Sequence, residues 1–167
     1  MDGLSVIGNR QHLLDRLGEE MARYNRTKQA LSFLLLDIDH YQSIRDRYSH
    51  SAVDYIIKVL SQLLPSSLRK YDIVDQYSEE EFGIILPNTN LSLSLQVGER
   101  LRSRVENYAF LFGQERLPIT VSIGLAEASP SVSDSIELIN QAVEALHKAR
   151  KDGRNCVCPS RQTIHWE

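Results

Sequence analysis

The sequence has few of the residues that form the disulfide bonds or zinc sites on which some small folds depend. Its 167 residues include two cysteines, five histidines and five prolines. Cys156 and Cys158 are separated by one residue, and a disulfide between such close positions is geometrically awkward, so we expect both thiols to be reduced. The histidines do not have the spacing of zinc ligands. The fold must therefore depend on a hydrophobic core, which a chain of this length can build.

A large excess of charge and long apolar runs are also absent. The formal net charge is −3, with both signs interspersed, whereas a nucleic-acid polymer as partner would require a basic face. No apolar run approaches the roughly 20 residues of a membrane-spanning helix, and no signal peptide is recognisable. We therefore expect no nucleic-acid polymer as partner, no direct membrane insertion and a cytoplasmic location. We also expect one domain over residues 1–158 and a tail over 159–167.

The apolar pattern predicts an alternation of strands and helices. Residues 31–37 are short and almost continuously apolar, as in a strand that is buried on both faces. Residues 41–64 have helical periodicity, with an expected irregularity at 49–52 and with Pro65 at the end. Further strands are expected at 71–77, 82–86, 117–126 and 155–158, and further helices at 12–24, 91–105 and 136–149.

This order is a βαββαβ core followed by αβ, the split βαβ arrangement of ferredoxin-like and palm-type domains. The predicted class is α+β, with a central, mainly antiparallel sheet whose helices cover one face. In this topology the first and third strands are antiparallel neighbours at the centre of the sheet. The end of the first strand then lies beside the start of the third.

Acidic residues gather at that point of the predicted sheet. Asp37 and Asp39 follow the first strand, and the turn Ser78-Glu79-Glu80-Glu81-Phe82 precedes the third, so Asp37 should approach Glu80. Neighbouring carboxylates raise one another's pKa unless a cation neutralises them. Oxygen ligands favour Mg²⁺ or Ca²⁺, and Mg²⁺ often completes its shell with water and phosphate. The pattern indicates a nucleoside triphosphate site; the alternative is that the glutamates solvate an exposed hairpin.

Several ordered motifs point to a family. They are Asp2-Gly3-Leu4, Asn9-Arg10, Asp37-Ile38-Asp39-His40-Tyr41, Tyr48-Ser49-His50 with Asp54, Tyr77 to Phe82, Ile84 to Thr89, Thr120 to Gly124, and Ala149 through Asn155. From about Asp2 to Cys158, the chain resembles the GGDEF domain of diguanylate cyclases, which join two GTP molecules into cyclic di-GMP.

The resemblance implies roles for individual residues. The metal ligands would be Asp37, Glu80 and the carbonyl of Ile38, and the GTP-binding positions would be Gln42, Arg45, Asp54, Ser78, Glu79, Arg150 and Arg154. Catalysis, if retained, would use Asp37 and Glu80 with Mg²⁺. It would also require two domains face to face, each presenting one GTP, and therefore a homodimer.

The sequence departs from the family pattern at positions that would bind the phosphates and the guanine of GTP. Ser78 and Glu79 replace the two glycines of the motif, and glycine is favoured beside a phosphate because it allows close approach of the backbone. Arg45 replaces the asparagine that reads guanine and offers only donors. Gln42 replaces a lysine and so removes a cation. These changes weaken substrate binding more than metal binding, and we expect efficient cyclase activity to be absent.

A second set of residues is intact. Arg69 and Asp72 form an Arg-x-x-Asp pair nine residues before Ser78, where the family carries its inhibitory product site, and Arg100 matches a further basic contributor. A guanidinium and a carboxylate suit the phosphates and guanines of cyclic di-GMP. The alternative is structural, with a helix-terminal Arg69 paired to a strand-capping Asp72.

The leading hypothesis is a degenerate GGDEF module that binds cyclic di-GMP through Arg69, Asp72 and Arg100 and relays its level to a protein partner or from an upstream sensory domain. One alternative is a weak, product-inhibited diguanylate cyclase. Another is a scaffold that binds GTP or protein without turnover. The sequence leaves open the partner, the oligomeric state and whether the chain is a piece of a longer protein.

Overall fold

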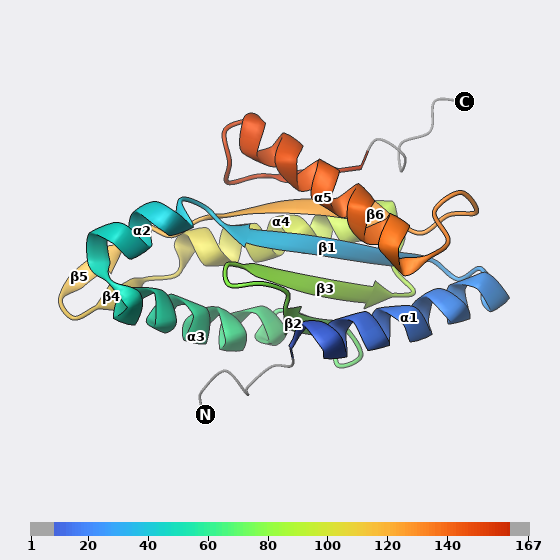
Figure 1. Cartoon of the computed structure of the whole chain (residues 1–167), viewed down its shortest axis with the longest axis horizontal. Coiled ribbons are helices and arrows are strands. Elements are labelled where there is room, and N and C mark those ends of the chain that lie inside the picture. The colour runs from blue at the N-terminus through green and yellow to red at the C-terminus, as the bar shows by residue number, and fades with distance from the viewer. Residues whose placement is uncertain (1–8, 161–167) are drawn as a thin grey trace.

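The computed structural model describes residues 9–160, so the Asp2-Gly3-Leu4 motif and residues 161–167 of the expected tail lie outside the described residues. The main sheet has the order β2-β3-β1-β6-β7 (Figure 1). Its strands are β1 (Leu31–Ile38), β2 (Ile73–Gln76), β3 (Glu81–Pro87), β6 (Val121–Glu127) and β7 (Val157–Pro159). All neighbours are antiparallel except β6 and β7. The predicted α+β class and the central pairing of the first and third strands are confirmed.

All of the described helices except the second begin at a side chain that accepts a hydrogen bond from the first turn. The helices are α1 (Arg10–Thr27), α2 (Tyr41–Tyr48), α3 (His50–Ser66), α4 (Leu91–Asn107) and α5 (Ser135–Lys151). Asn9, Asn90 and Asp134 cap α1, α4 and α5 through side-chain oxygens. Within residues 9–160, no helix has both the length and the apolar content needed to cross a membrane.

The irregularity expected at 49–52 is a break between two helices. Ser49 has a φ of 138°, which ends α2, and its side chain accepts a hydrogen bond from the Ala52 N–H at the start of α3. One helical pattern in the sequence therefore corresponds to two helices that meet at Ser49.

Helices cover both faces of the sheet, so the expectation that they cover one face is wrong. Leu34 and Leu36 pack with α3 and α4, whereas Phe33 and Leu35 pack with α1 and α5. Every position of β1 is buried, so this strand has no polar face to leave to water. The result is a three-layer arrangement with the sheet in the middle (Figure 1).

The expected strand at 117–126 is two separate elements. Leu117 ends a short hairpin of β4 (Phe110–Phe112) and β5 (Glu115–Leu117), and β6 begins only at Val121. Phe110 and Leu117 are buried in the core on the α3 and α4 side of the sheet. Strands of three residues are too short to show a periodicity, which is why the sequence pattern missed the hairpin.

Gly124 is expected to be essential for the packing of α5 on β6. A Cβ at this position would lie 2.2 Å from the Ala142 carbonyl oxygen and 2.3 Å from the Leu146 nitrogen, both backbone atoms. We predict that Gly124→Ala lowers the free energy of unfolding by about 3 kcal/mol, because backbone cannot move aside as a side chain does. Urea unfolding measures this.

Gly18 in α1 provides the matched control, since a Cβ there would meet no atom of the described residues within 4 Å. Gly18→Ala should raise stability by about 0.5–1 kcal/mol. Equal unfolding midpoints for Gly124→Ala and the wild type would show that α5 shifts freely over β6.

Candidate functional site

The β1–β3 pairing brings two acidic residues together. Asp37 pairs in register with Glu81, and the Ile38 N–H donates to the Glu80 carbonyl at 3.1 Å. Asp37, Ile38 and Glu80 line one pocket of about 430 Å³. The predicted approach of Asp37 to Glu80 is therefore confirmed.

The pocket has a cationic side as well. Arg150, near the end of α5, and Arg154, in the following loop, line it opposite the first turn of α2, which contributes Tyr41 and Gln42. Arg150 donates to Oδ2 of Asp37 from Nε at 3.0 Å and also from Nη2. Arg150 thus neutralises part of the charge that Asp37 and Glu80 bring together.

Asp37 keeps one oxygen available for a cation. Its side chain is buried, and its Oδ1 has no hydrogen-bond partner among residues 9–160. Burial and the Glu80 carboxyl raise the pKa of Asp37 to about 7, although Arg150 acts in the opposite direction. A buried oxygen without a partner beside a second carboxylate fits Mg²⁺.

Metal binding at this place would depend on few protein ligands. Residues 9–160 contain no group of three or more His, Cys, Asp and Glu side chains arranged to hold a metal. The available donors are the carboxylates of Asp37 and Glu80 together with the backbone carbonyl of Ile38. Such a partial shell is typical of Mg²⁺ that also takes water or phosphate oxygens.

Arg45 contacts both Gln42 and Glu79, two other positions that the sequence singled out. Arg45 donates from Nη1 to Glu79 Oε2 at 3.3 Å and from Nη2 to Gln42 Oε1 at 3.2 Å. Burial and a hydrogen bond with Glu79 raise the pKa of the neighbouring Tyr41 to about 12. Glu79 therefore reaches toward α2, and the guanidinium of Arg45 is already engaged. We call Gln42, Arg45 and Glu79 the rim cluster. Gln42 and Arg45 are three residues apart on α2, so their contact follows from helical spacing, whereas the contact with Glu79 depends on tertiary structure.

Two further candidates have other positions. Ser78 donates from Oγ to Glu81 Oε1 at 2.8 Å, and thus closes the turn between β2 and β3. Asp54 is exposed on α3 and is not among the residues that line the pocket. Its assignment to guanine stays a prediction.

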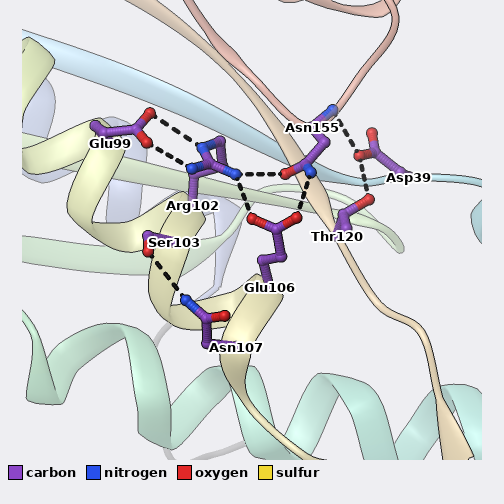
Figure 2. A network of polar contacts seen from close by, with 8 residues as sticks. All are labelled: Asp39, Glu99, Arg102, Ser103, Glu106, Asn107, Thr120 and Asn155. Carbon is purple, nitrogen blue, oxygen red and sulfur yellow. Dashed lines mark hydrogen bonds and ion pairs between the residues drawn. The ribbon is translucent and has the colours of Figure 1, made fainter.

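Asp39 does not line the pocket with Asp37 and has a separate set of contacts. Its carboxylate accepts hydrogen bonds from Thr120 Oγ1 at 2.7 Å, Ser122 Oγ at 2.6 Å and the Asn155 N–H at 3.0 Å. Figure 2 shows Asp39 between Thr120 and Asn155. This buried carboxylate ties β6 and the loop after α5 to the end of β1.

The Arg-x-x-Asp pair lies just after the C-terminal end of α3. The Arg69 N–H donates to Asp72 Oδ2 at 2.8 Å, and its guanidinium donates to Asp72 Oδ2 at 3.3 Å and to Thr89 Oγ1 at 2.5 Å. The Asp72 side chain is 1% exposed and that of Arg69 is 43% exposed. The structural contact that the sequence offered as an alternative is therefore present, and it holds Arg69 in place with one side in solvent.

Further groups gather around Arg69. Arg100 donates to the Ser67 carbonyl at 2.9 Å, and Arg104 donates to Ser67 Oγ at 2.8 Å. Tyr71 is 53% exposed, and the guanidinium carbon of Arg69 lies 4.9 Å from its ring centre. Sequence reasoning missed Arg104 and Tyr71, although Arg104 follows Arg100 by one helical turn and Tyr71 lies within the Arg-x-x-Asp motif.

Comparison with known sequences identifies similar domains. A family model described as "Diguanylate cyclase, GGDEF domain" matches residues 1–156. Diguanylate cyclase A of Treponema denticola is 31% identical over 137 residues, which make up 82% of this chain and 37% of that protein. The chain spans between 23% and 37% of the length of several curated relatives that it matches.

Solved structures share the fold. Diguanylate cyclase SiaD of Pseudomonas aeruginosa, in complex with its activator SiaC, has 32% identity and a TM-score of 0.89, covering 95% of this chain and 61% of that chain. The GGDEF domain of DgcB from Caulobacter crescentus, in complex with c-di-GMP, has 26% identity and a TM-score of 0.89, covering 95% of this chain and 94% of that chain.

The pocket leads to a prediction about Mg²⁺. We expect about 10 mM Mg²⁺ to raise the free energy of unfolding by about 1 kcal/mol, because a ligand that binds only the folded state stabilises it. Asp37→Asn should abolish this increment, measured by urea unfolding with Mg²⁺ or EDTA. Asp15→Asn, at an exposed position of α1, should retain it. An equal increment in all three proteins would show that Mg²⁺ acts elsewhere.

Proposed function

Because the chain belongs to the GGDEF family of diguanylate cyclase domains, we propose that it is a degenerate member that serves as a receptor for cyclic di-GMP. The observation that carries this proposal is that Arg100 and Arg104 both bond Ser67, two residues before the half-exposed Arg69, at the end of α3. The carboxylate that contacts Arg69, Asp72, is buried beneath it. The outward surface of this cluster is therefore cationic.

The chemistry of the cluster suits a cyclic dinucleotide. Its ligand carries two phosphates, which match guanidinium donors, and two purines, which stack on exposed aromatic or guanidinium faces. Arg69 and the exposed Tyr71 offer both kinds of contact side by side. The similar DgcB domain has been solved with c-di-GMP, which supports this choice of ligand. In the proposal Asp72, whose side chain is 1% exposed, contributes by orienting Arg69.

Loss of efficient cyclase activity follows from the rim cluster. Arg45 bonds Glu79 and Gln42, so it is held by two other side chains at the position where the family reads guanine. Glu79 places a carboxylate where the family has a glycine beside a phosphate. Since a misplacement of about 1 Å can cost about a hundredfold in rate, an altered cradle is enough to suppress turnover.

A second candidate is a weak, product-inhibited diguanylate cyclase. It is favoured by Asp37, Glu80, Arg150 and Arg154, which share one pocket and could bind Mg²⁺ and the phosphates of GTP. Such an enzyme would act as a homodimer, with one GTP on each domain. The same pocket would serve a scaffold that holds GTP without turning it over.

The receptor needs a protein to receive its signal. The curated relatives are much longer than this chain, and SiaD was solved with an activator protein. We propose either an upstream sensory domain or a separate protein as partner, in the cytoplasm, where the proposed ligand is a diffusible nucleotide.

Calorimetric titration with cyclic di-GMP tests the receptor. The wild type should show saturable binding, and Arg69→Ala should weaken it by at least about tenfold, since a bond to a charged group contributes roughly 1.5–3 kcal/mol. Arg100→Ala should weaken it by about fivefold. Arg47→Ala, at an exposed arginine of α2, should bind like the wild type.

Two outcomes would sink the receptor. One is the absence of binding heat in the wild type, and the other is equal affinity in Arg69→Ala and Arg47→Ala. Because Arg69 also bonds Thr89, urea unfolding of Arg69→Ala should accompany the titration, and Arg100→Ala provides a change at an exposed side chain.

Incubation with GTP and Mg²⁺, followed by chromatography of the nucleotides, tests turnover. At protein concentrations that allow dimers, we expect GTP to remain unchanged, because the rim cluster alters the phosphate cradle. Cyclic di-GMP that forms with the wild type and not with Glu80→Ala would instead establish the cyclase.

A further inference from the structure

The loop after α5 carries Arg154 to the pocket in an unfavourable backbone conformation. Arg154 has a φ of 66° and Asn155 a φ of 49°, so two consecutive residues other than glycine are left-handed. Such residues persist where their surroundings hold them. Arg154 lines the same pocket as Asp37 and Glu80. The contacts that hold this loop therefore decide where the Arg154 guanidinium lies.

Asn155 contributes to this hold, beside the Arg154 N–H, which donates to the Ala149 carbonyl at 3.0 Å. The Asn155 N–H donates to Asp39 Oδ2 at 3.0 Å, Asn155 Nδ2 donates to Glu106 Oε2 at 2.9 Å, and Asn155 Oδ1 accepts from Arg102 Nη1 at 2.8 Å. Figure 2 shows the Asn155 amide facing Arg102 and Glu106 on α4. A donor and an acceptor on the helix thus match the two ends of the amide and fix its orientation.

Arg102 and Glu106 are also held by contacts that do not involve Asn155. Arg102 donates to Glu106 Oε1 at 2.8 Å and to both oxygens of Glu99, at 3.0 and 2.5 Å. Its side chain is only 15% exposed. The bonds to Arg102 lower the pKa of Glu99 and of Glu106, so both stay ionised at neutral pH. The contacts among Glu99, Arg102 and Glu106 hold these side chains in place, so the loop docks on a surface that is already ordered.

We propose that Arg102 and Glu106 are positioning residues that fix Asn155 and thereby hold Arg154 at the pocket, where its guanidinium binds the phosphates of a nucleoside triphosphate. This inference rests on nucleotide binding at the Asp37–Glu80 pocket and is independent of the Arg69 cluster. Neither Arg102 nor Glu106 lines the pocket, so they act through Asn155.

The proposal is tested by calorimetric titration with Mg²⁺ and 3′-deoxy-GTP, which lacks the hydroxyl needed for joining to a second nucleotide. Arg102→Met and Glu106→Ala should each weaken binding by about fivefold, because Arg154 is then free to leave the phosphates. Glu106→Gln keeps one carbonyl oxygen for Asn155 Nδ2 but turns its NH2 group toward the Arg102 donor, so it should weaken binding less than Glu106→Ala does.

Asn107→Ala is the matched control. Asn107 is exposed on the same helix and bonds Ser103, so its removal should leave the affinity unchanged (Figure 2). Cyclic di-GMP titration of the same variants should match the wild type. A wild type that binds 3′-deoxy-GTP and not cyclic di-GMP would overturn the receptor and support this inference.

Hydrogen exchange supplies a readout that general destabilisation does not reproduce. In Glu106→Ala, the amides of Arg154 and Asn155 should exchange faster while those of β1 and β6 keep wild-type rates. Three results would each overturn the proposal: unchanged affinity in both Arg102→Met and Glu106→Ala, uniform acceleration of exchange across the sheet, or no saturable binding of 3′-deoxy-GTP by the wild type.

Discussion

The antiparallel pairing of β1 with β3 is the constraint on which the rest of the molecule depends. It runs from Leu31 opposite Pro87 to Asp37 opposite Glu81 at the centre of the sheet. Because side chains alternate along a strand, this register decides which residues of β1 face α3 and α4 and which face α1 and α5. A shift of one residue would exchange the two sets and would also separate Asp37 from Glu80. Core and pocket are thus specified by the same hydrogen bonds.

Packing of the hydrophobic core must offset the free-energy cost of burying the acidic groups of the pocket. A buried carboxylate beside another is unfavourable, and burial raises the pKa of Asp37 even with Arg150 in contact. The apolar sheet and its two helix layers hold these groups in place although they repel. The cation that relieves the repulsion comes from α5, which packs on β6 through close contact at Gly124. Packing and electrostatics are therefore coupled through one helix.

Features that depend on local pattern could be predicted from the sequence. The continuous apolar run of β1, the interruption near Ser49 and the meeting of Asp37 with Glu80 all follow from periodicity and topology. The second helix layer was missed because an apolar strand does not say which helices cover it. The Asp39 contacts were missed because Thr120 and Asn155 are distant in sequence and only tertiary structure brings them there. The roles of Asp54, Arg69, Asp72 and Arg100 in binding stay predictions.

The rim cluster has a consequence for how this domain can change by mutation. Glu79 bonds Arg45, and Arg45 bonds Gln42, so the effect of any one of these side chains depends on the others. Replacing Glu79 by glycine alone would leave the Arg45 guanidinium without its carboxylate partner, still at the same place. Replacing Arg45 alone would leave Glu79 with no cation to offset its charge. The three positions are therefore epistatic: a single replacement leaves a mismatched partner, and only combined replacement removes the cluster without leaving one.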